Sequence, residues 1–136
     1  MLSPTTDTIR LFLHVLAASV WVGGQIVLAG LVPSLRRAHP DATRIAANAF
    51  ARVAWPAFAV VVVTGLWNLG DIDVANTTTS YQITLFVKIG LAMVSGAAAA
   101  VHQLGNSKVA LAVGGAVGLL AALGAMFCGY LLTTGA

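Results

Sequence analysis

The chain has 136 residues, of which 59% are hydrophobic and 8% charged, whereas soluble globular domains carry roughly 25% charged residues. So few charges cannot solvate a surface, which argues against a cytosolic protein, a disordered chain or a coiled coil. The formal net charge of +3 is spread along the chain and forms no basic patch of the kind that nucleic acid requires. We therefore expect a membrane protein whose main partner is the lipid bilayer, with no nucleic-acid partner.

Apolar runs recur along the chain with the length of about 20 residues that crosses a bilayer core of about 30 Å. The predicted spans cover about residues 9–32, 50–69, 81–104 and 109–132. No cleavage pattern follows the first run, so it is predicted to be a span rather than a signal peptide. The connection from Pro33 to Ala49 is expected to be a loop. The predicted fold is an all-α integral membrane four-helix bundle that forms a single domain over residues 1–136.

The charges in the connections predict an orientation. The first connection carries Arg36, Arg37 and Arg44, whereas the connection after the second span carries two aspartates and no Lys or Arg. By the positive-inside rule the first connection is cytoplasmic. Both termini are therefore expected outside, in a multi-pass protein of the inner (cytoplasmic) membrane of the cell.

Small residues in the last span follow a regular spacing. Gly114, Gly118 and Ala122 fall four residues apart, which lets two helix backbones approach closely. This face is expected to pack either within the bundle or against another subunit, including a second copy of the chain.

Polar residues inside the spans are the place to look for function, because each costs on the order of 2.5 to 3.5 kcal/mol to insert. In the third span they recur at every seventh position, as Tyr81, Lys88, Ser95 and His102. This spacing forms one stripe that drifts by only about 20° per heptad. The stripe is expected to face protein, with Ser95 hydrogen-bonded to a neighbouring helix and His102 at the membrane interface.

In the first span His14, Trp21 and Gln25 share one face. We expect this polar stripe and that of the third span to face each other across the bundle interior. A rise of about 1.5 Å per residue places His14 and Lys88 at nearly the same depth, in the outer half of the membrane. The same count places His102 roughly 21 Å deeper than Lys88, so His14 and His102 are not expected to share one haem or metal ion.

His14 and Lys88 are the strongest candidates for a functional site. An imidazole binds haem iron, copper or zinc, and a lysine in a low-dielectric site can act as a base or a ligand. The alternatives are that His14 bonds a neighbouring helix and that Lys88 extends its amine to the outer interface. Trp21 either walls a cofactor pocket or fills the core. Tyr81, on the stripe of Lys88, completes the candidate cofactor-binding set.

Parts of the chain resemble a known family. Residues 13–24, with the sequence LHVLAASVWVGG, and residues 33–37, PSLRR, resemble the opening helix of the copper-resistance CopD-like membrane domain. Residues 50–66 and 79–88 resemble the next two helices of that domain in order. The layout of a His in the first helix, a Trp seven residues later and a Lys in the third helix is also similar to HemJ-type protoporphyrinogen oxidases, small membrane proteins that bind haem b.

The resemblance implies a protein that handles haem b or a transition metal such as copper. His14 would be the ligand, and Lys88 the second ligand or a proton relay. Three alternatives stay open: a component of a copper uptake or resistance permease, a HemJ-like protoporphyrinogen oxidase, and a non-catalytic membrane assembly subunit. Whether the chain is an enzyme is therefore open, but a soluble-substrate hydrolase is excluded because the spans contain no Asp or Glu.

Overall fold

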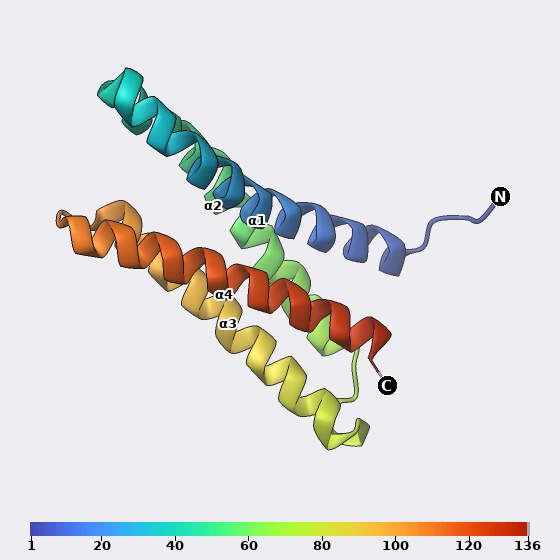
Figure 1. Cartoon of the computed structure of the whole chain (residues 1–136). Coiled ribbons are helices and arrows are strands. Elements are labelled where there is room, and N and C mark those ends of the chain that lie inside the picture. Colours follow the sequence, from blue (N-terminus) through green and yellow to red (C-terminus); the bar gives the residue numbers. More distant parts are fainter. Residues whose placement is uncertain (136) are drawn as a thin grey trace. The chain divides into compact units, whose positions relative to one another are not determined.

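A computed structural model describes residues 1–135 of the chain (Figure 1). The elements are α1 (Thr6–Ala38), α2 (Pro40–Gly70), the short 3-10 helix η1 (Val74–Asn76), α3 (Thr79–Leu104) and α4 (Lys108–Thr134). The part of the chain that the structure describes contains no strand. The four α-helices are each long and apolar enough to cross a membrane. The all-α class is therefore confirmed, and each predicted span lies inside one helix.

The first connection differs from the prediction. Helix α1 continues through Pro33, and α2 begins at Pro40, so His39 alone separates the two helices. Pro40 explains the position of the break, because a proline pushes the residue before it out of the helical region, and His39 is extended with φ −148° and ψ 92°. Pro40 is also favoured at the first position of the new helix. The prediction of a loop from Pro33 to Ala49 was wrong.

The chain divides into two compact units, Met1–Ile72 and the part from Asp73 onward. In each unit two consecutive helices lie side by side, α1 with α2 and α3 with α4 (Figure 1). We call these pairs the first hairpin and the second hairpin and describe each by itself. Hydroxyl side chains start three of the four long helices, since Thr5, Thr78 and Ser107 each accept a hydrogen bond from a backbone N–H in the first turn.

An aromatic cluster holds the first hairpin together. The ring of Trp21 on α1 lies 4.5 Å from that of Phe58 and 5.4 Å from that of Trp55, both on α2. Only 6% of Trp21 is exposed. Further along the same interface, Gly24 leaves a notch that the ring of Phe50 fills. The two helices therefore pack through contacts between aromatic rings and, at Gly24, through a ring against a small residue.

The second hairpin packs through small residues. The position that a Cβ would take at Gly114 on α4 is 2.9 Å from the carbonyl oxygen of Ala98 and from the backbone nitrogen of His102 on α3. The side chain of Leu91 lies against Gly124 in the same way, 3.0 Å from the corresponding position. Gly118 and Ala122 are buried. Helix α3 thus uses the small-residue face of α4, and a second subunit on this face stays a prediction.

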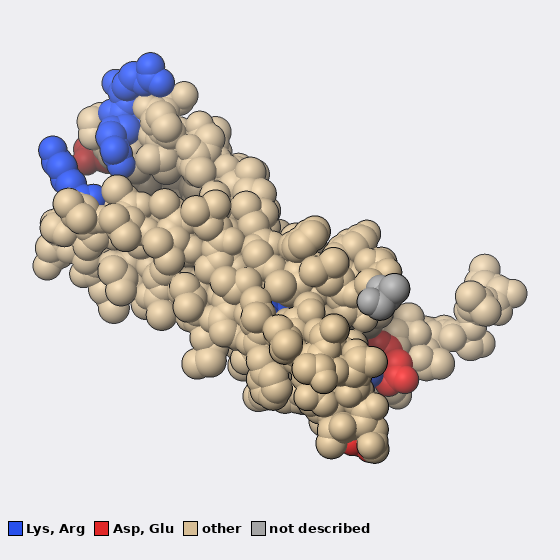
Figure 2. Space-filling model, turned by 60° about the horizontal axis from the view of Figure 1, so that its bottom comes forward, with Lys and Arg blue, Asp and Glu red and all other residues tan. Residues whose placement is uncertain are grey.

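Large apolar side chains cover the outer faces of the helices. Phe12, Phe86 and Phe127 are each more than 60% exposed, and Lys, Arg and Asp cover only small parts of the surface seen in Figure 2. In water such a surface would aggregate. The bilayer is its matching solvent, so these faces contact lipid.

Gly24→Ala is expected to destabilise the first hairpin by about 1–3 kcal/mol, since the added methyl overlaps the ring of Phe50. The matched control is Gly23→Ala, where a Cβ meets nothing within 4 Å. Thermal unfolding of both variants in detergent micelles measures the difference. Equal midpoints for the two variants would show that Phe50 does not fill the notch.

Candidate functional site

His14 on α1 and Thr64 on α2 meet across the first hairpin. His14 precedes the break at His39 by 25 residues and Thr64 follows it by 25, so the hairpin brings the two side chains to the same level. The Nδ1 atom of His14 lies 2.7 Å from the hydroxyl oxygen of Thr64. Thr64 is only 4% exposed. The imidazole is thus held from the neighbouring helix by a buried hydroxyl.

The hydrogen bonds of Thr64 determine which nitrogen of His14 carries the proton. The Thr64 hydroxyl lies 2.6 Å from the carbonyl oxygen of Val60 and 3.2 Å from that of Val61, and it donates to this pair. A hydroxyl has one proton to donate, so toward His14 it accepts. Nδ1 of His14 therefore carries a proton, and in the neutral ring the lone pair lies on Nε2. Histidines that bind metals have this arrangement, with the other ring nitrogen donating to a fixed acceptor.

An apolar groove on the surface of the first hairpin includes Thr64, the hydrogen-bond partner of His14. It has a volume of about 320 Å³ and is lined by Leu13, Ala59, Val60, Val63, Thr64 and Trp67. Gly65 lies against the imidazole, where a Cβ would stand 3.5 Å from Cε1 of His14. The groove and Gly65 therefore give the Thr64 side of the imidazole apolar neighbours, and the Thr64 hydroxyl orients the ring.

Trp21, which the sequence placed in the cofactor set, belongs to the aromatic cluster with Trp55 and Phe58. It lies two turns from His14 along α1. Of the two roles predicted for its ring, core filling is the one that its packing supports.

The other candidates belong to the second hairpin. Lys88 on α3 lies against Gly129 on α4, where a Cβ would be 3.4 Å from the amine. The Ser95 hydroxyl, 1% exposed, donates to the carbonyl oxygen of Gly118 at 2.8 Å, which confirms the predicted bond between helices. His102 bonds the carbonyl oxygen of Leu111 through Nδ1.

Part of each polar stripe contacts the other helix of its own hairpin. Ser95 and His102 on α3 contact α4, and His14 and Trp21 on α1 contact α2. That the two stripes also face each other across the bundle interior stays a prediction. His14 belongs to the first unit and Lys88 to the second. Tyr81 also belongs to the second unit, in the first turn of α3, where its N–H donates to Thr78.

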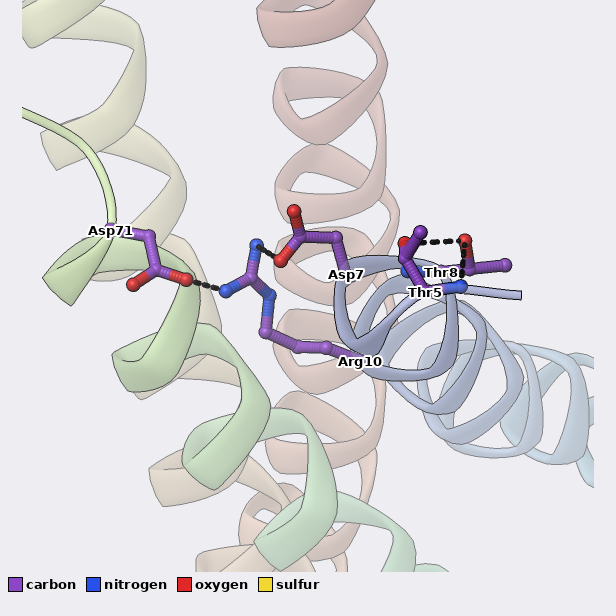
Figure 3. A network of polar contacts seen from close by, with 5 residues as sticks. All are labelled: Thr5, Asp7, Thr8, Arg10 and Asp71. Atoms are coloured by element: carbon purple, nitrogen blue, oxygen red, sulfur yellow. Dashed lines mark hydrogen bonds and ion pairs between the residues drawn. The ribbon is translucent and has the colours of Figure 1, made fainter. Parts of the chain in front are cut away.

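A largely covered arginine that was not among the predicted site residues joins the start of α1 to the end of α2 (Figure 3). Arg10 pairs with Asp7 one turn earlier at 3.2 Å and with Asp71, which caps the end of α2. Its guanidinium lies 5.6 Å from the ring centre of Trp67, and its side chain is 11% exposed. This network closes the open end of the first hairpin.

Two signals in the sequence could have identified these residues. Thr64 is the one hydroxyl residue within the second predicted span, residues 50–69, and a polar side chain at that depth is a candidate for a bond to another helix. Arg10 lies at the start of the first apolar run, and Asp71 follows the end of the second. A hairpin brings the start of its first helix next to the end of its second helix. Opposite charges at these two ends are therefore expected to pair.

The metal-binding side chains of the described residues fit haem better than a bare copper or zinc ion. Residues 1–135 contain no group of three or more His, Cys, Asp or Glu that could hold a metal ion. A copper or zinc site made of several side chains of this kind therefore has no support there. Haem iron is held mainly by its macrocycle and takes one axial histidine from the protein, which a neutral imidazole oriented through Nδ1 can supply.

These features define a small multi-pass membrane protein with an oriented histidine inside an apolar helical hairpin. No protein-family model, curated protein or solved structure matches the chain. The class of the protein therefore rests on its own helices and side chains.

The Arg10–Asp71 pair is expected to stabilise the first hairpin by about 1–2 kcal/mol, because the side chain of the arginine is only 11% exposed while that of its partner is half exposed. A double-mutant cycle of Arg10→Gln and Asp71→Asn, followed by thermal unfolding, measures the coupling. The control is Asp7→Asn, which removes an exposed pair within one helix and should cost about 0.5 kcal/mol or less. Additive effects of Arg10→Gln and Asp71→Asn would exclude the coupling.

Thr64→Val is expected to change the tautomer of His14, because valine keeps the shape of threonine and removes the acceptor for Nδ1–H. The change should also cost about 1 kcal/mol of stability. Imidazole ¹⁵N chemical shifts, recorded above the titration range of the ring, report the proton position. Thr84→Val, which removes a hydroxyl bonded within α3, should leave the shifts of His14 unchanged. A wild-type ring protonated on Nε2 would contradict the assignment.

Proposed function

We propose that this protein binds haem b in the membrane through His14 on the first hairpin. The observation that carries the proposal is the hydrogen bond from Nδ1 of His14 to the Thr64 hydroxyl, whose own proton is used on the carbonyl oxygen of Val60. This arrangement keeps a neutral imidazole in one orientation and one tautomer. An axial ligand to haem iron needs both properties.

The surroundings of His14 support the same proposal. The groove that includes Thr64, the partner of His14, is lined mainly by apolar side chains, which suit the faces of a porphyrin. Within this site Thr64 orients the ligand, and Gly65 leaves room beside the ring. Bound haem would supply a one-electron redox centre in the membrane.

The wider predictions from the sequence belong to this proposal. Membership of the CopD-like family, and the likeness to HemJ-type oxidases, would both give a membrane protein with a histidine in the first helix. The role of Lys88, as second ligand or proton relay, rests on the sequence alone. A copper permease is supported less well than haem binding, since the described residues offer no cluster of ligands for the ion.

The test is the absorption spectrum of the full chain, purified in detergent and supplied with haem b. We expect a Soret band typical of histidine-ligated haem for the wild type, and loss of that band in His14→Ala. The matched controls are His39→Ala and His102→Ala, which remove the two other histidines and should keep the band.

Thr64→Val should bind haem with a shifted redox midpoint, because the ligand loses the acceptor that polarises its N–H. A wild-type protein that gives no Soret band with added haem would overturn the proposal. So would a band of equal strength in His14→Ala. Thermal unfolding of each variant separates the loss of a ligand from the loss of the fold.

A further inference from the structure

The first hairpin is longer than a bilayer core is thick. Helix α1 has 33 residues and α2 has 31, which correspond to about 50 Å and 46 Å at the rise of an α-helix. The hydrocarbon core needs about 30 Å. Roughly ten residues of each helix therefore lie outside the hydrocarbon.

The charges indicate which end projects. At the open end of the hairpin Arg10 and Asp71 mark the boundary, and the apolar residues of both helices begin directly beside them. Twenty residues from there, about 30 Å, reach about residue 30 on α1 and residue 50 on α2. The excess length is thus at the closed end, in residues 31–48. We call this segment the basic end.

The basic end carries three exposed arginines, Arg36, Arg37 and Arg44, against the single acid Asp41, which gives it a net charge of +2. Lys and Arg side chains seen in Figure 2 extend outward from the surface. Arg37 is partly fixed by a hydrogen bond of 3.3 Å from its Nε to the carbonyl oxygen of Pro33. Asp41 is the one acid within residues 31–48, so this segment keeps an excess of positive charge.

Depth and apolar neighbours define what this surface can bind. Arg36 and Arg44 each lie six residues beyond the core boundary at about residues 30 and 50, which is about 9 Å, and from there their long side chains reach the level of the lipid phosphates. Ile45, next to Arg44, is 68% exposed, and Leu31 is 49% exposed. A cationic group at phosphate depth with apolar side chains beside it matches a phospholipid, which has a phosphate above an acyl chain.

We propose that the basic end of the first hairpin binds anionic phospholipid headgroups. Each guanidinium donates paired hydrogen bonds to phosphate oxygens, and the net positive charge favours headgroups that carry a net negative charge over zwitterionic ones. The exposed Leu31, at the core boundary, contacts the upper part of the acyl chains. The bound lipid anchors the closed end of the hairpin at a fixed depth.

The experiment uses the full chain in neutral detergent, titrated with phosphatidylglycerol or with phosphatidylcholine of the same acyl chains. Native mass spectrometry counts the lipids that stay bound. We expect phosphatidylglycerol to be retained in preference to phosphatidylcholine. The variant Arg36→Gln/Arg37→Gln/Arg44→Gln should lose on the order of 100-fold in affinity for phosphatidylglycerol, and Arg44→Gln alone about fivefold.

Lys108→Gln, which removes one positive charge in the second hairpin, is the matched control and should change the affinity less than twofold. Glycerol phosphate, the same headgroup chemistry without acyl chains, should not displace the lipid at equal concentration. Displacement by glycerol phosphate would assign the site to soluble phosphates and overturn the proposal. Unchanged lipid preference in the triple variant would overturn it as well. The arginines are exposed, so thermal unfolding is expected to be the same for all variants.

Discussion

Hydrocarbon offers no hydrogen-bond partner, so a polar side chain in a membrane helix has to be satisfied by its own helix or by a neighbour. Both solutions occur here. Gln25 bonds a carbonyl of α1, whereas His14 and Ser95 each bond a group on the other helix of their hairpin. The bonds between helices fix which residues stand at the same level, and the aromatic cluster of the first hairpin and the small-residue contacts of the second fill the remaining interface.

The same bond that joins the two helices of the first hairpin also sets the chemistry of His14. The Thr64 hydroxyl stabilises the hairpin by accepting a hydrogen bond from Nδ1–H of His14, and the same bond favours the tautomer with the proton on Nδ1. Structure and proposed function therefore depend on one buried hydroxyl. At the open end of the hairpin, Arg10 contributes stability through its ion pairs without taking part in that site.

The sequence was sufficient for the helices, because length and hydropathy alone decide what can cross a bilayer. Which residues face each other within a hairpin depends in addition on the position of the turn. The connection between the last two spans was placed correctly after Leu104, and the bonded pair of that hairpin, Ser95 and Gly118, lies 11 and 12 residues from its centre at residue 106. In the first hairpin Pro33 and the arginines were interpreted as a loop, although arginines near a helix end stabilise it. The centre of that predicted loop, residue 41, lies two residues beyond the true break.

That displacement places Asn68 rather than Thr64 opposite His14, an error of four residues, or about 6 Å along the helix. A connection of one residue cannot compensate for a shift of one helix along the other. An insertion or deletion anywhere between His14 and Thr64 moves one side chain by about 1.5 Å and rotates it by about 100° relative to the other. The number of residues between His14 and Thr64 therefore matters as much as their identity, because a change in that number separates the imidazole from the hydroxyl even when both residues are kept.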